Sequence, residues 1–267
     1  MDPKLHSRNK PSPGYTRMVG PGEGKLDYLE VGILRLDDGQ VFESNTGEQE
    51  VALTLLSGRC NAEVEGTRWE GLYRRDPFRD WDKCTTLYVP IGSSYRVEAD
   101  GPVEIAVSKA ATDFKGEPRL IGPEEVATRV VGRGQTWQWE INLIIPQSFA
   151  AGRLLLGEDL TMPGNWASYP PHKHDEDRPP EEARKEEVFL YKVDPPQGYG
   201  IQRVYTADGS FDEAYVVKDN DCVALPWGHH PAVAGGGYRL FFVWAMARAD
   251  HEGTGVVDPK HAWMVPD

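Results

Sequence analysis

Short apolar runs separated by turn residues recur along the whole chain. Leu29–Leu36 and Val51–Leu56 are two such runs, and they end at Asp37-Asp38-Gly39 and at Ser57-Gly58. The other runs are residues 86–90, 95–98, 103–107, 153–156, 187–193, 200–205, 214–217 and 240–244. Runs of this length between turn residues predict β-strands, and many of them predict an all-β sandwich or barrel.

The glycine and proline content agrees with this pattern. The 267 residues include 28 Gly and 21 Pro, which are disfavoured inside helices and punctuate chains of strands and turns. One stretch, Pro123–Ala127, begins with proline as helices often do and predicts a short helix near the middle of the chain. We expect this stretch to join two domains, residues 1–125 and residues 126–267.

The two halves also resemble each other. Glu50-Val51 opens a strand in the first half, and the turn Pro90-Ile91-Gly92 follows it. In the second half Glu187-Val188 opens a strand and Pro226-Trp227-Gly228 follows. Although P-x-G turns are common, the repeat indicates two tandem β-barrels.

Charge and composition narrow the class of function. With 29 Lys and Arg against 42 Asp and Glu, the net charge is −13, and no basic face is available for nucleic acid. No apolar run approaches the ~18 residues of a membrane span. The first 13 residues contain no apolar region of a secretory signal, and the three cysteines form no C-x-x-C pair. We therefore expect a cytoplasmic protein with reduced thiols.

The second half contains candidate metal ligands. His172 and His174 are two residues apart, which places both imidazoles on the same side of a strand. Glu187 lies on the next apolar run, and His230 follows the second P-x-G turn. A single histidine of this kind is usually an ordinary core or surface residue. Four of the chain's seven histidines gather at 172–174 and 229–230, however, and this favours a site for a divalent ion.

The first half lacks such a set. Ser93-Ser94-Tyr95 follows its P-x-G turn, and no H-x-H pair precedes Glu50. Its one histidine, His6, lies in a leader whose composition is typical of disorder. We expect the first barrel to be structural or to contribute contacts within a homo-oligomer.

An H-x-H pair, a glutamate and a histidine after P-x-G form the signature of cupins. Several longer segments resemble the bacterial 5-deoxy-glucuronate isomerases of myo-inositol catabolism. These enzymes are related to the deoxy-hexulose-uronate isomerase of pectin breakdown. The resembling segments are residues 165–177, 186–191, 198–206, 212–215, 226–231 and 258–263. The resemblance implies a bicupin, an all-β protein of two tandem cupin-type barrels with the metal site in the second.

The resemblance also implies the ligands. They would be His172, His174, Glu187 and His230, with Zn or Mn as the expected ion and Fe or Ni as alternatives. Seven acids follow the histidines, and Glu187 is favoured because it begins the strand that the family places after its ligand; the others are Asp175, Glu176, Asp177, Glu181, Glu182 and Glu186. His229 would then support a ligand or face the substrate.

The reaction implied is an aldose–ketose isomerisation of a small sugar acid, 5-deoxy-glucuronate to 5-dehydro-2-deoxy-gluconate. Four protein ligands on a six-coordinate ion leave two positions for a carbonyl and a neighbouring hydroxyl oxygen. A general base must move a proton from C2 to C1, and the sequence offers Tyr205, Tyr215, Glu213 and Lys173 without choosing among them. We take Tyr205 and Tyr215 as the catalytic candidates.

The substrate carboxylate needs a cation, ideally a bidentate one. Arg203 is our candidate, and Gln202 and Lys173 are further candidates for substrate binding. Two other functions compete with the isomerase: a metal-dependent cupin dioxygenase, which would use the same ligands, and a non-catalytic sugar-binding bicupin. No G-x-G-x-x-G follows a strand, so we expect no nicotinamide cofactor.

Overall fold

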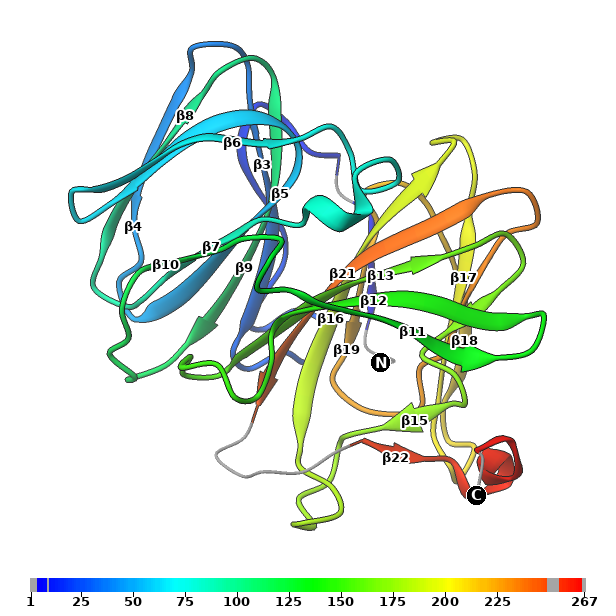
Figure 1. Ribbon diagram of the computed structural model, residues 1–267. Coiled ribbons are helices and arrows are strands. Elements are labelled where there is room, and N and C mark those ends of the chain that lie inside the picture. The colour runs from blue at the N-terminus through cyan, green and yellow to red at the C-terminus, as the bar shows by residue number, and fades with distance from the viewer. Residues whose placement is uncertain (1–3, 9, 249–254, 266–267) are drawn as a thin grey trace.

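The structure, a computed structural model, describes residues 4–8, 10–248 and 255–265. These residues form β-strands joined by turns and loops, with two short 3-10 helices, η1 (Trp81–Lys83) and η2 (Pro259–Met264). No helix in the described ranges is both long and apolar enough to span a membrane. Figure 1 shows two curled groups of strands side by side. The prediction of an all-β protein with two tandem barrels is confirmed.

One sheet forms the first barrel. Its central order is β10-β7-β5-β9-β3-β2, with β4, β6 and β8 completing the barrel. The strands are β2 (Gly14–Val19), β3 (Leu29–Leu36), β4 (Val41–Asn45), β5 (Gln49–Val64), β6 (Thr67–Arg74), β7 (Thr86–Val89), β8 (Ser94–Ala99), β9 (Val103–Ala111) and β10 (Arg119–Ile121).

The long strand β5 departs from the sequence prediction. It does not end at Ser57-Gly58 but continues to Val64, and near Gly58 it exchanges its partners β7 and β9 for β6 and β8. Gly58 has a φ of +95°, and a Cβ there would lie 2.1 Å from the carbonyl oxygen of Pro102. The glycine therefore permits a close approach of backbone within a strand rather than ending it.

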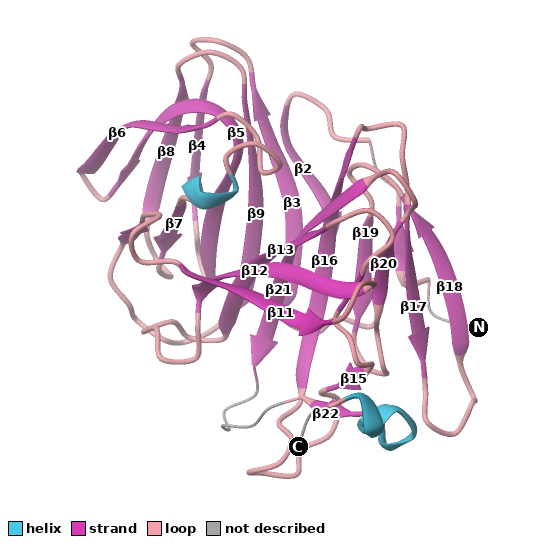
Figure 2. Cartoon of the chain, turned by 45° about the vertical axis from the view of Figure 1, so that its right-hand side comes forward, coloured by secondary structure: helices cyan, strands magenta, loops and turns pink. Residues whose placement is uncertain are grey.

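Three smaller sheets form the second barrel. Their orders are β1-β19-β16-β21-β13-β12-β11, β14-β20-β17-β18 and β15-β22. The strands are β1 (His6–Ser7), β11 (Ala127–Arg133), β12 (Trp137–Ile145), β13 (Leu154–Thr161), β14 (Trp166–Ala167), β15 (His172–Lys173), β16 (Lys185–Asp194), β17 (Gly200–Tyr205), β18 (Asp212–Val217), β19 (Cys222–Leu225), β20 (Ala232–Ala234), β21 (Arg239–Arg248) and β22 (Val256–Val257). In Figure 2, η2 and β22 lie beside β15 at one end of this barrel.

Two local predictions are wrong. The segment around His6 is an ordered strand, β1, which pairs with β19 of the second barrel, because Leu5 is buried and the His6 ring nitrogen lies 2.8 Å from Asp221 Oδ2. Residues 123–126 form a turn, not a helix, and β11 begins at Ala127. Five residues between two strands are too few to nucleate a helix. The boundary at residues 125 and 126 lies in this connection and stays a prediction.

Alternation of side chains on β16 separates two cores. Val188 and Leu190 join a core that also contains residues of the first half, whereas Phe189 and Tyr191 pack inside the second barrel. The same alternation orients the polar residues of β16. It therefore decides which of them can reach a site inside the second barrel.

The register shows how the repeat of the two halves should be aligned. Val51 pairs with Val89, which precedes Pro90, and Glu187 pairs with Leu225, which precedes Pro226. Glu50 therefore corresponds to Glu186, one residue away from the alignment suggested by the sequence. At the position of Glu187 the first barrel has an apolar valine.

Candidate metal centre

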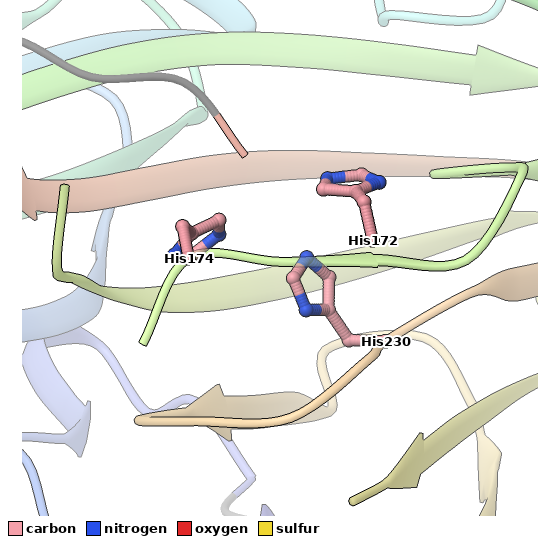
Figure 3. A group of neighbouring side chains, drawn as sticks. All are labelled: His172, His174 and His230. Carbon is pink, nitrogen blue, oxygen red and sulfur yellow. The ribbon is translucent and has the colours of Figure 1, made fainter. Parts of the chain in front are cut away.

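Three histidines converge at one end of the second barrel. His172 lies on β15, opposite Val257 of β22, and His174 follows two residues later. His230 comes from the turn after β19, where Gly228 has a φ of +86°. The rings point toward one another (Figure 3), and one ligand atom from each lies within 4.8 Å of the others.

Glu187 completes the cluster from β16. Its Oε2 lies 3.1 Å from His174 Nε2 and 3.3 Å from His230 Nε2. Glu187, His174 and His230 are all buried. The structure therefore brings together the four residues predicted as ligands, although the ligand assignment itself stays a prediction.

Backbone carbonyl groups orient the rings. The Nδ1–H of His174 donates to the Lys185 carbonyl oxygen at 2.9 Å, and that of His230 donates to Gly228 at 2.8 Å. His172 Nδ1 lies 3.4 Å from the Pro170 carbonyl oxygen. With the Nδ1 atoms engaged in this way the Nε2 atoms face the centre, as in histidine metal sites, and that of His174 also lies within hydrogen-bond distance of Glu187 Oε2.

One buried imidazole nitrogen is well suited to bind a metal ion. His230 Nε2 is buried and makes no hydrogen bond. A buried polar atom without a hydrogen bond is costly, and a bound ion would remove that cost. Three imidazole nitrogens and one carboxylate suit a borderline divalent ion such as Zn or Mn.

The protonation states of two candidate ligands, His172 and His230, also suit a cation. Burial, and then the neighbouring His174, lower the pKa of His172 to about 4. Burial and the two other histidines hold the pKa of His230 well below its ordinary value. Burial alone would lower the pKa of His174, but its hydrogen bond to Glu187 and that carboxylate's charge outweigh this and raise it. His172 and His230 are therefore neutral at pH 7.

Gln202 is buried beside the cluster but is engaged by the protein. The Tyr191 hydroxyl donates to its Oε1, and its Nε2 donates to the carbonyl oxygens of His230 at 2.7 Å and Pro231 at 3.1 Å. In the structure Gln202 thus holds the backbone that carries His230.

Arg203 faces the opposite side of β17. Its guanidinium donates two hydrogen bonds to Asp212, at 2.8 Å and 2.7 Å, and stacks on the Tyr205 ring. The side chain is 41% exposed. The structure does not bring Arg203 into the histidine cluster.

The two candidate catalytic tyrosines lie in different places. The Tyr205 ring stacks on His229 at 4.9 Å, and its hydroxyl donates to Asp258 Oδ2 at 2.8 Å. Tyr215 lies on β18 against His6, with ring centroids 5.6 Å apart. Tyr205 therefore reaches the cluster only through His229, on the same side of β17 as Arg203, and Tyr215 belongs to a groove near β1.

Lys173 and Glu213 lie outside the cluster. The Lys173 ammonium donates to Glu182 at 2.9 Å, to Glu176 at 3.1 Å and to Asp175. Its side chain alternates with those of His172 and His174, and this ion network orders the loop after β15. Glu213 is exposed on β18.

Sequence reasoning missed two polar residues inside the second barrel. Lys185 is two residues before Glu187, so strand alternation could have found it. Asp159 accepts a hydrogen bond from Trp244 Nε1 at 3.0 Å. It was missed because the predicted run stopped at residue 156, whereas β13 extends to Thr161.

Two tandem barrels, with three histidines and a glutamate gathered in the second, define a bicupin with a candidate metal centre in its second barrel. The model of the KduI/IolB family matches residues 4–264, and the chain belongs to this family. The 5-deoxy-glucuronate isomerase of Geobacillus kaustophilus is 37% identical over 97% of this chain and 93% of its own length. The 5-deoxy-glucuronate isomerase of Bacillus subtilis is 28% identical over 92% of this chain and 91% of its own length.

Solved structures agree with the fold. An IolB-like protein from Salmonella typhimurium matches with a TM-score of 0.93 at 29% identity, over 98% of this chain and 99% of that one. An oxalate decarboxylase of Lactobacillus farciminis in complex with formate matches with a TM-score of 0.70 over 100% of this chain and 92% of that one. Its identity is 11%, so this second match bears on the fold alone.

Proposed function

We propose that this protein is a metal-dependent aldose–ketose isomerase of myo-inositol catabolism, which interconverts 5-deoxy-glucuronate and 5-dehydro-2-deoxy-gluconate. Relatives named 5-deoxy-glucuronate isomerase match nearly the whole chain. The observation that carries the metal dependence is the buried contact of Glu187 with His174 and His230.

His172, His174, Glu187 and His230 would hold the ion. A bound divalent ion would polarise the carbonyl oxygen of the open-chain sugar acid and the adjacent hydroxyl. The backbone carbonyl groups of Lys185 and Gly228 keep two of the rings in place. Because the cluster is held before substrate arrives, little reorganisation is needed during the reaction.

Tyr205 is the proposed participant in proton transfer. Burial, and then the hydrogen bond and charge of Asp258, raise the pKa of Tyr205. The hydroxyl is therefore protonated at neutral pH, so it would act as a hydrogen-bond donor toward a developing oxyanion rather than as the general base. A cytoplasmic location and a homo-oligomer remain proposals made from the sequence.

The experiment is anaerobic turnover of 5-deoxy-glucuronate, followed by NMR in D₂O. We expect conversion without oxygen uptake, with deuterium at the carbon that was the aldehyde, because an enediol exchanges its proton with solvent. Oxygen-dependent loss of the sugar would favour the dioxygenase. If folded, metal-loaded protein does not convert the sugar, the isomerase function is excluded and a sugar-binding function is favoured.

A further inference from the structure

The segment 255–265 packs against the strand that carries His172. Its strand β22 pairs with β15, so that Val257 lies opposite His172 (Figure 2). A Cβ at Gly255 would lie 3.0 Å from His172 Cδ2, which means that the glycine backbone lies against the imidazole ring. The other two rings of the cluster have Nδ1 hydrogen bonds of 2.9 and 2.8 Å, whereas the His172 Nδ1 contact is 3.4 Å long. His172 is therefore the ring that gains most from a neighbouring segment.

Asp258 makes the contacts that fix this segment in place. The residue is 2% exposed. Its backbone N–H donates to the carbonyl oxygen of Pro171, directly before His172, at 2.8 Å. Its Oδ1 accepts the Lys260 N–H at 2.9 Å at the start of η2, and its Oδ2 accepts the Tyr205 hydroxyl at 2.8 Å. One aspartate thus connects the chain before β15, the helix η2 and the end of β17.

Tyr205 extends this connection to the turn that carries His230. Tyr205 and His229 exchange two backbone hydrogen bonds, of 3.0 and 2.8 Å, and their rings stack with centroids 4.9 Å apart. His230 is the next residue, and its ring projects into the ligand cluster (Figure 3). The backbone from which the His230 ring projects is therefore held against Tyr205.

We infer that Asp258 is a positioning residue of the metal centre, which holds the strand of His172 and the turn of His230 at a fixed separation. This inference rests on the proposed metal dependence, and it assigns part of the metal affinity to the segment 255–265. Residues that orient metal ligands from behind typically contribute about 10–100-fold to metal affinity. Ligands on separate elements bind an ion more tightly when their separation is fixed beforehand, because less order has to be imposed on binding.

The test measures Zn²⁺ affinity of the full chain by competition with a chelator, and the visible absorption spectrum of the Co²⁺-loaded protein. This spectrum reports on the arrangement of the ligands. Asp258→Ala should weaken Zn²⁺ binding about tenfold and change the Co²⁺ spectrum. Asp258→Asn keeps an oxygen for the Lys260 N–H and an amide that can donate to the Tyr205 hydroxyl oxygen, so its affinity should stay within about twofold of wild type.

Tyr205→Phe tests whether Asp258 acts through the tyrosine. The change removes the hydroxyl and keeps the stacked ring, and we expect Zn²⁺ binding to weaken roughly fivefold. The double variant Asp258→Ala/Tyr205→Phe should bind no more weakly than Asp258→Ala alone, because both changes break the same hydrogen bond. The readout is metal binding, so it does not depend on the role proposed for Tyr205 in the reaction.

The matched control is Asp208→Ala. Asp208 is exposed in the turn between β17 and β18, and its Oδ1 accepts the Ser210 N–H at 3.0 Å, as Asp258 accepts that of Lys260. The control removes an aspartate with the same local backbone contact. It should leave both the Zn²⁺ affinity and the Co²⁺ spectrum unchanged.

Unchanged Zn²⁺ affinity or an unchanged Co²⁺ spectrum in Asp258→Ala would overturn the inference. Additive losses in the double variant, or an equal loss in Asp208→Ala, would do the same. If Asp258→Ala does not fold, Tyr205→Phe decides, because unchanged affinity in that variant contradicts a connection through the tyrosine. A wild-type protein that binds no Zn²⁺ would instead remove the metal centre on which the inference rests.

Discussion

Glu186 and Glu187 are adjacent on β16, and their carboxylates serve opposite sides of the strand. Glu186 accepts hydrogen bonds from the backbone N–H groups of Asp27, Tyr28 and Leu29 in the first half, at 2.8, 2.7 and 2.5 Å. Glu187 faces the histidines inside the second barrel. Strand alternation thus separates a carboxylate that joins the two halves from one that completes the candidate metal centre.

Glu186→Gln should destabilise the protein without emptying the metal centre. The change weakens three charge-assisted hydrogen bonds, so we expect the free energy of unfolding to fall by about 2–4 kcal/mol. Urea unfolding of the metal-free protein measures this change. An unchanged unfolding midpoint would show that these hydrogen bonds do not stabilise the contact between the halves.

Glu187→Gln should have the opposite effects: it should empty the metal centre and leave the stability of the protein nearly unchanged. The metal content should fall to near zero, while the free energy of unfolding of the metal-free protein changes by less than about 1 kcal/mol, because loss of a buried charge offsets loss of its contact with His174. Elemental analysis and urea unfolding measure the two effects. A fully loaded Glu187→Gln protein would exclude this glutamate as a ligand.

Most strands and the four residues of the cluster could be predicted from the sequence. The H-x-H spacing places two imidazoles on one side of a strand, and the P-x-G turn marks the place of His230. The acid was harder to choose, because seven acids follow His174 and only the family resemblance selected Glu187. The one-residue offset of the repeat was not visible either, since it depends on strand register.

The position of Arg203 could not be predicted in the same way. Arg203 sits in a segment that resembles the family, but on β17 it alternates with Gln202 and pairs with Asp212. Lys185 has no conspicuous motif, and its orientation follows only once β16 is known to begin there. Hydrogen-bond partners that are distant in sequence, such as Asp258 for Tyr205, could likewise be identified only from the fold.

A buried ion pair joins the two halves at a second point. The Arg74 and Glu158 side chains have no exposed surface, and their shortest contact is 2.6 Å. Replacing Arg74 alone by Met should cost about 3–5 kcal/mol, because Glu158 is left buried without its partner.

The double variant Arg74→Met/Glu158→Leu should recover much of that loss, because neither buried charge remains. Urea unfolding of both single variants and the double variant gives the coupling energy between the residues. Additive losses would show that the pair does not act as a unit.

Metal affinity should rise with pH above the ordinary histidine pKa of about 6.5. Glu187 raises the pKa of His174, so the metal-free protein holds a proton there that stabilises it at low pH and is lost as the pH rises through that pKa. The ion must displace this proton.

Calorimetric titration with Zn²⁺ at pH 7 and at several higher pH values, in buffers of different ionisation enthalpy, counts the protons released. We expect a net release that falls toward zero as the pH is raised. Proton release that does not change with pH would contradict this assignment of the proton to His174.

The most direct test of the account is a titration of metal-free protein with Zn²⁺ or Mn²⁺ while the isomerisation of 5-deoxy-glucuronate is measured. Activity should rise linearly and stop at one ion per chain, and His230→Ala should stay inactive and empty while His229→Ala keeps its metal. Full turnover by metal-free protein, or by His230→Ala, would contradict the account.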